Sequence, residues 1–252
     1  MVAARGRGLG LPACFSTGVP VPDAERTFTG LEVTARKRVG ASLWAQLSYL
    51  YSKLEGNYSG AVSTSFWQTN PGINADFDYY QMSEGAYGRL ELDRPHQVRL
   101  DGAYTFPFGL TFALGAYVRS GVPITLTNAL NSYYVYHVFP EGRGTYGRTP
   151  TDWEADVALS WPIQVGPVTV TPQVFVFRVF NRQTPTTIGA DFNPYASFVD
   201  DPSSPYYGQA GITHGAPGCD GSTVPCTDNP DFGKTYFRTQ PRQLRVALRV
   251  SF

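Results

Sequence analysis

The fold is decided by the last stretch of the sequence, Gln240-Pro241-Arg242-Gln243-Leu244-Arg245-Val246-Ala247-Leu248-Arg249-Val250-Ser251-Phe252. From Leu244 onward, every second residue is apolar, and this period of two predicts a β-strand with one apolar face. The opposite face carries Arg245 and Arg249, and Phe252 directly follows the alternation. An apolar face for lipid, a charged face for a watery lumen and an aromatic residue at the interface are typical of a transmembrane β-barrel strand. The alternative is an edge strand of a soluble β-sandwich.

The composition narrows the class of protein. The chain has 252 residues, 14% of them aromatic, with 26 glycines, 20 prolines and a formal net charge of zero. The zero net charge argues against a nucleic-acid partner. No apolar run reaches the length of about 18 residues that a membrane helix needs. Residues 1–27 are rich in glycine and proline, show no period and lack the apolar core of a secretory signal, so they are predicted to be irregular, and a start within a longer reading frame is expected.

Six further alternating segments precede the terminal strand. Strands are predicted at 28–39, 41–55, 97–106, 110–119, 153–161 and 168–180. The last of these is apolar on both sides, so the sequence leaves its lipid-facing side open. Pro172 interrupts it and suggests a bulge or a local bend.

The connections between the seven strands alternate strictly between short and long. Short turns are predicted near Gly40, Pro107 and Pro162, and long loops at 56–95, 120–152 and 181–239. Outer-membrane barrels place short turns in the periplasm and long loops outside, which puts Phe252 at the periplasmic rim. Aromatic residues at both ends of the strands predict two girdles: Phe106, Trp161 and Phe252 below, and Tyr49, Tyr51 and Trp153 above.

Seven strands cannot by themselves form the usual barrel. A single-chain bacterial barrel has an even number of strands, at least eight, and an open edge in lipid leaves backbone groups unpaired. We therefore expect an all-β fold of about seven antiparallel transmembrane strands that form an incomplete portion of a larger barrel. The alternative is an eighth strand within residues 1–27 or the loops.

Several motifs, in this order along the chain, resemble TonB-dependent outer-membrane receptors of the Oar-like subgroup. They are Phe28-Thr29-Gly30-Leu31-Glu32-Val33-Thr34-Ala35-Arg36-Lys37-Arg38, Leu47-Ser48-Tyr49-Leu50-Tyr51-Ser52-Lys53, Asp93-Arg94-Pro95-His96-Gln97-Val98 with Tyr104-Thr105-Phe106-Pro107-Phe108-Gly109, and Val179-Phe180-Asn181-Arg182-Gln183. The resemblance covers residues 28–252 and implies the C-terminal portion of that family's barrel. The terminal strand resembles the C-terminal strand that the barrel assembly machinery recognises in outer-membrane proteins, with Phe252 as the assembly signal.

The resemblance carries expectations about function. Members of the family have a 22-strand barrel, an N-terminal plug and a TonB box, and this sequence has no room for the plug or the box. We expect part of a transporter in the bacterial outer membrane that takes up an unidentified ligand, with the rest of the barrel, the plug and TonB as partners. The alternative is a stand-alone small outer-membrane barrel with a structural, adhesion or surface-interaction role.

The polar faces of the predicted strands carry the candidate functional charges. These lumen-side residues are Glu32, Arg36, Arg99, Asp101, Arg119, Glu154, Asp156, Arg245 and Arg249. One interpretation is a polar conduit or a surface that contacts a plug. The other is a solvated interior in which opposite charges pair across strands.

The predicted loops are rich in tyrosine and contain most of the remaining candidate residues. Their aromatic residues are Tyr58, Trp67, Tyr79, Tyr80, Tyr87, Tyr133, Tyr134, Tyr136, Tyr206, Tyr207 and Tyr236, which suit either ligand capture or loop packing. Cys219 and Cys226 could form a disulfide that closes a small loop. The cysteines and the three histidines, His96, His137 and His214, lack zinc-site spacing, so no metal or cofactor is expected. Although His96 lies near Asp93, no serine has a G-x-S-x-G context, and we expect no enzyme.

Overall fold

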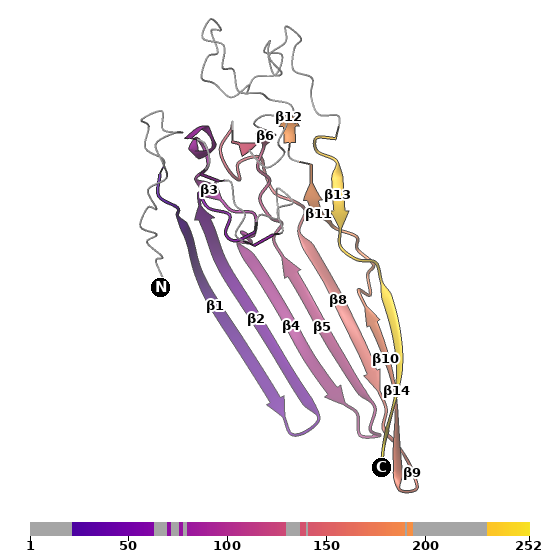
Figure 1. The fold of residues 1–252 in the computed structure, drawn as a ribbon. Coiled ribbons are helices and arrows are strands. Elements are labelled where there is room, and N and C mark those ends of the chain that lie inside the picture. The colour runs from indigo at the N-terminus through magenta and orange to yellow at the C-terminus, as the bar shows by residue number, and fades with distance from the viewer. Residues whose placement is uncertain are drawn as a thin grey trace, which may run out of the picture.

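The computed structural model describes residues 22–62, 70–71, 76–77, 80–129, 137–139, 141–189, 191–193 and 231–252. Its largest sheet has nine strands, and the prediction of an all-β fold with seven antiparallel strands in sequence order is confirmed (Figure 1). The seven are β1 (Arg26–Val39), β2 (Leu43–Gly56), β4 (His96–Thr105), β5 (Thr111–Arg119), β8 (Asp152–Ser160), β10 (Val168–Phe177) and β14 (Gln243–Ser251). The remaining two are short: β3 (Gly88–Arg89) pairs with β2, and β9 (Ile163–Val165) pairs with β10.

Short turns connect the strands at the lower end of Figure 1, and the long connections lie at the upper end. The tightest turn joins β9 to β10 through Gly166 and Pro167, since Val165 and Val168 pair directly. Gly166 has φ +60°, and a Cβ added there would meet no atom within 4 Å. Its backbone conformation, rather than a lack of space, therefore favours glycine at this turn.

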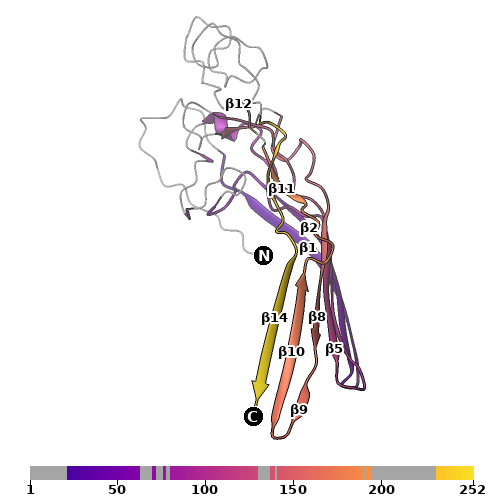
Figure 2. The same cartoon turned by 90° about the vertical axis from the view of Figure 1, so that its right-hand side faces the viewer.

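The sheet is curved and open. β1, β2, β4 and β5 lie side by side in Figure 1, where β10 and β14 overlap, whereas the view from the side in Figure 2 separates β10 from β14. The path of pairing ends at β1 on one side and at β14 on the other. Among the described residues, no strand pairs with the outer edge of either one.

One face of the sheet is apolar across all seven strands. Paired residues on neighbouring strands share a face, and the register aligns Val39, Leu43, Tyr104, Phe112, Leu159, Val174 and Val246 in one row. This face is uncovered: Leu244 and Val246 of β14 are 69% and 71% exposed. A soluble sandwich would bury such a face against a second sheet. The buried apolar residues instead lie near the upper ends of the strands, for example Leu54, Leu90 and Phe139.

The register also settles which side of β10 belongs to the apolar face. Val174 and Val176 pair with Val246 and Leu244, so they share that face, while Phe175 lies opposite Arg245 on the polar face. The bulge or bend suggested for Pro172 is not found in the pairing with β14, which continues through this residue without a shift. Proline is accommodated because the pairing of β10 with β8 begins at Gln173, and the pairing with β9 ends at Val170.

The long connections contain short structural elements that the sequence did not predict. They are η2 (Tyr80–Ser83), a 3-10 helix, and the strands β6 (Thr127–Ala129), β7 (His137–Val138), β11 (Pro185–Ile188), β12 (Asp191–Asn193) and β13 (Thr235–Arg238). β6 pairs with β7 and β12, and β11 pairs with β13. In the described part of the chain, no helix has the length and apolar character needed to cross a membrane.

Candidate functional site on the polar face and its loop cap

The polar face of the sheet forms a cavity of about 410 Å³. β1, β2, β4, β5 and β8 contribute its lining, which is Glu32, Ser48, Leu50, Gln97, Val98, Arg99, Asp101, Gly115, Ala116, Tyr117, Val118, Arg119 and Asp156. Gly115 pairs with Asp101 on one side and with Asp156 on the other. Because glycine has no side chain, the wall is hollow between these two carboxylates.

Two arginines of the cavity are each bound by a carboxylate. Arg99 and Asp101 are two residues apart on β4, and Arg99 Nε lies 2.8 Å from Asp101 Oδ2. Arg119 of β5 lies directly opposite Asp152 of β8, with Nη2 2.7 Å from Oδ2. Tyr117 Oη also donates to this carboxylate, at 3.3 Å. The Arg119–Asp152 contact is thus a cross-strand pair, the arrangement expected for a lumen whose charges are balanced locally.

Glu154 and Asp156 hold a sharp bend that follows β10. The bend contains two non-glycine residues with positive φ, Arg178 at 55° and Asn181 at 53°. Asp156 accepts the backbone N–H of Arg178 at 2.7 Å. The buried Glu154 accepts those of Phe180 and Arg182 at 2.9 and 3.1 Å. These bonds compensate for a backbone conformation that is uncommon outside glycine.

The remaining predicted lumen-side charges lie apart from the cavity lining. Arg245 is opposite Phe175, and Arg249 is opposite Thr171, both at the β14 edge of the sheet. Arg36, on β1, lies opposite Gln46. The structure therefore gathers Arg99, Asp101, Arg119 and Asp156 around one cavity and leaves the two β14 arginines exposed at an edge.

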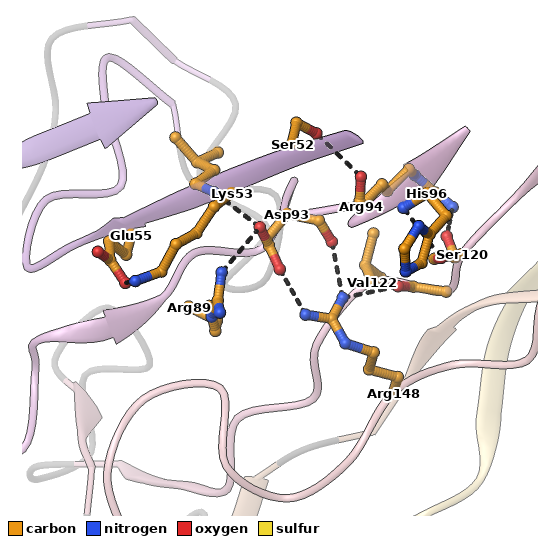
Figure 3. Close-up of polar contacts among 12 residues, drawn as sticks. Ser52, Lys53, Glu55, Arg89, Asp93, Arg94, His96, Ser120, Val122 and Arg148 are labelled. Atoms are coloured by element: carbon orange, nitrogen blue, oxygen red, sulfur yellow. Dashed lines mark hydrogen bonds and ion pairs between the residues drawn. The ribbon is translucent and has the colours of Figure 1, made fainter. Parts of the chain in front are cut away.

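Asp93 joins two long loops to the sheet (Figure 3). This residue is 1% exposed, and its Oδ1 accepts the backbone N–H of Leu54 at 2.7 Å. Arg148, from the other loop, forms an ion pair with Asp93 Oδ2 and donates to the Asp93 carbonyl at 3.0 Å. Nearby, Arg94 Nη1 donates to the Ser120 carbonyl at 2.6 Å. Burial and then the charge of Arg119 lower the pKa of Arg94 from its usual value.

Arg143, which is buried, also connects the same two loops. It is 3% exposed, donates to the Ser59 hydroxyl and lies 3.5 Å from Glu91 Oε2. Its guanidinium also stacks over the ring of Phe139, with Cζ 5.0 Å from the ring centroid. The backbones of Gly88 and Arg143 approach each other closely here: a Cβ added to Gly88 would lie 2.1 Å from the Arg143 carbonyl oxygen. The described loop segments 57–62, 80–95, 120–129, 137–139 and 141–151 are thus cross-linked by charge, and we call them the loop cap.

The aromatic loop residues divide between packed and exposed positions. Tyr58 stacks on Phe77, whereas Tyr146, which contacts Phe232 edge to face, is 48% exposed. Tyr87 and Tyr236 are 52% and 44% exposed. The other predicted loop aromatics lie outside the residues whose side chains are described, namely Trp67, Tyr79, Tyr80, Tyr133, Tyr134, Tyr136, Tyr206 and Tyr207. Cys219, Cys226 and His214 also lie outside the described residues.

The histidine considered for catalysis is engaged with tyrosine rather than with a carboxylate. His96 Nδ1 is 2.9 Å from Tyr49 Oη, and its ring packs against Tyr51. Asp93, three residues earlier, directs its carboxylate to Leu54 and Arg148. In the described part of the chain, no group of three or more histidine, cysteine, aspartate or glutamate side chains is arranged to hold a metal ion.

The most constrained charges were not identified as site residues from the sequence. In the sequence, Asp93 stands out only as part of a resemblance motif and as a neighbour of His96, and no pattern marks Arg143 or Arg148. Arg148 meets Asp93 across 55 positions of the chain. No local period or spacing marks such a pair; the only available signal was the presence of charged residues in loops otherwise rich in glycine and tyrosine.

Comparison with known proteins finds that the sequence of this chain is similar to a TonB-dependent transporter. The chain is 27% identical over 245 residues to the TonB-dependent transporter Oar of Myxococcus xanthus, which confirms the predicted resemblance. The aligned region covers 92% of this chain and 23% of the relative, so the chain spans about a quarter of the relative's length. No family model matches the chain, and no solved structure matches it.

Proposed function

We propose that this chain is the C-terminal portion of the β-barrel of a TonB-dependent transporter in the bacterial outer membrane. One observation carries the proposal: an antiparallel sheet of seven strands exposes a continuous apolar face while its opposite face is charged. Only lipid accommodates such a face without a second layer, and the charged face then lines an aqueous lumen. Similarity to the transporter Oar supports the same class.

The direction of the edge strands supports a larger barrel. β1 and β14 both run toward the lower end of the sheet (Figure 1). Joining these two edges directly would place two strands of the same direction side by side. A barrel that is antiparallel throughout therefore needs an odd number of additional strands between them, and the total then becomes even, as in bacterial barrels. A stand-alone barrel of eight strands would need one additional strand, and residues outside the described part of the chain would have to form it.

The proposed orientation places the short turns in the periplasm and the loop cap outside the cell. Phe252, 106% exposed and directly after β14, then lies at the periplasmic rim as the signal for the barrel assembly machinery. We assign residues 28–252 to the barrel portion, with β1 beginning two residues earlier, at Arg26.

Ligand uptake is the proposed role of the complete protein. The loop cap captures a ligand outside, and Arg99, Asp101, Arg119 and Asp156 face the lumen, where they contact the solvent or a plug. The plug, the TonB contact and the energised step are assigned to other parts of the complete protein. A disulfide between Cys219 and Cys226 is proposed for the loop before β13.

The test uses the full-length natural protein that carries these residues, produced in a Gram-negative host. We expect it to fractionate with the outer membrane, to migrate differently on gels before and after boiling, and to crosslink to the periplasmic domain of TonB. Failure to reach the outer membrane contradicts the barrel assignment. Insertion without any crosslink to TonB contradicts transport and favours the structural or adhesion role.

A further inference from the structure

Three exposed arginines lie where β10 ends and β14 begins, at the upper side of the sheet. Arg182 follows the bend after β10, while Arg238 and Arg242 lie just before β14. The two segments are tied on either side of Arg182. Asn181 Oδ1 accepts the backbone N–H of Arg242 at 2.8 Å, and the Gln183 carbonyl accepts Arg238 Nη1 at 3.0 Å. We call Arg182, Arg238 and Arg242 the arginine corner.

The positive charge of the arginine corner is not balanced by the carboxylates beside it. Glu154 is occupied by the backbone N–H groups of Phe180 and Arg182, and Asp156 by that of Arg178. Asp231, on the segment that leads to β13, pairs with Lys234. Within the ranges that the structure describes, none of the three arginines is in an ion pair with a carboxylate.

Aromatic contacts place the arginine corner beside the apolar face. Trp153 lies opposite Val118 in the register, in the uppermost row of that face. The Arg182 guanidinium stacks over the Trp153 ring with Cζ 4.7 Å from its centroid, and Phe180 packs edge to face on the same ring. Phe180 is 57% exposed, and Leu244, the first apolar residue of β14, is 69% exposed. Arg182 thus stands beside an uncovered apolar surface that ends in a girdle of aromatic rings, and Arg238 and Arg242 are held next to it through Gln183 and Asn181.

We propose that the arginine corner binds the phosphate of a phosphorylated lipid in the outer leaflet of the membrane. This inference rests on the proposed membrane barrel. Guanidinium groups bind phosphate oxygens in a bidentate geometry, and Arg182 is already oriented by Trp153. A lipid is favoured over a soluble phosphate because the same molecule would also cover the exposed side chains of Phe180 and Leu244.

The probe is diphosphoryl lipid A, compared with lipid A from which both phosphates have been removed. Binding to the full-length protein in a neutral detergent is measured by titration with native mass spectrometry. The variant Arg182→Gln/Arg238→Gln/Arg242→Gln is compared with Arg36→Gln/Lys234→Gln/Arg249→Gln, which loses the same charge elsewhere. We expect the affinity for the diphosphoryl lipid to fall about fivefold per arginine in the first variant only. The dephosphorylated lipid should bind weakly to every variant.

Three results would overturn the inference. The first is an equal loss of affinity in both triple variants, and the second is equal binding of the two lipids. The third is that inorganic phosphate at millimolar concentration displaces the lipid and binds the protein as tightly as the lipid does. Each variant is first checked for outer-membrane fractionation and heat-modifiable migration. Wild-type protein that fails this check contradicts the proposed function itself. Protein that inserts but shows no preference for phosphate contradicts the lipid site alone.

Discussion

At Asp93 one buried carboxylate satisfies groups from two distant parts of the chain. Its side chain is fully enclosed, and it accepts the Leu54 N–H while pairing with Arg148. A buried charge is tolerated only when it is paired and hydrogen-bonded. Arg148 also donates to the carbonyls of Asp93 and Gly121 at 3.0 Å, so the same contact fixes the backbone of both loops. The loop cap is therefore held by paired charged residues together with a small buried apolar cluster that includes Met82, Leu90 and Phe139.

Replacing Asp93 should loosen the loop cap. Asp93→Ala removes the carboxylate partner of Arg148 and leaves the buried Leu54 N–H without its acceptor, at a cost of about 1–3 kcal/mol. Hydrogen exchange of the full-length protein should quicken in peptides covering 86–95 and 120–150. Asp101→Ala is the matched control, because its partner Arg99 has a side chain that is 70% exposed. Similar exchange in the two variants would show that Asp93 does not organise the loops.

Glu154 gives a second prediction at the residue scale. In Glu154→Gln the side-chain amide presents N–H groups to the backbone donors of Phe180, Arg182 and Ala155, so at least one bond is lost, at about 1–3 kcal/mol. Exchange should rise in a peptide covering 178–184. Glu55→Gln removes a carboxylate whose pair, Lys53, is a half-exposed neighbour on the same strand, and it should leave that peptide unchanged. If hydrogen exchange in this peptide were unchanged in Glu154→Gln, the bend would not depend on the Glu154 carboxylate.

At the scale of the element, strands are predictable where the alternation is complete. β14 shows one apolar and one charged face, so its sequence alone predicts both the strand and its facing. β10 does not, because Val176 and Phe177 are both apolar; only pairing with β14 decides that Val176 joins the apolar face. Strands of two to four residues, such as β7 and β13, are too short to show a period, so the predicted loops appeared featureless. The charged residues that line the cavity on the polar face were predictable from the sequence. The shape of the cavity was not, because it depends on the strand register that places Gly115 between Asp101 and Asp156.

The two faces of β14 provide a test of the lipid-facing side. Val246→Lys places a charge on the exposed apolar face, whereas Ala247→Lys places it on the polar face one residue later. In a bilayer the first change should cost about 2–4 kcal/mol near the midplane, and the second should cost little. Urea unfolding of the full-length protein in liposomes, followed by heat-modifiable migration, measures the difference. Equal destabilisation by the two lysines would contradict a lipid-facing apolar side.

At the scale of the whole molecule, the two ends of the sheet are unlike. The lower end has only short turns, and the upper end carries the loop cap and the two small sheets above the strands. The alternation of short and long connections was visible in the sequence because turn residues interrupt the period. How the loops lock together was not visible, since Arg143 meets Ser59 across 84 positions. In the proposed orientation, this asymmetry puts the loop cap outside the cell.

That orientation can be measured with cysteines at the two ends of the sheet. Ala41→Cys lies in the short turn between β1 and β2, and Glu141→Cys lies on an exposed part of the loop cap. Both are made in full-length protein in which Cys14, Cys219 and Cys226 are serine. A maleimide that cannot cross membranes should label Glu141→Cys in intact cells, because the cap faces outward, and should label Ala41→Cys only after the outer membrane is permeabilised. The reverse labelling pattern would show that the barrel has the opposite orientation, with Phe252 outside the cell, where the assembly machinery could not bind it. Labelling of both cysteines in intact cells would show that the sheet does not span the membrane.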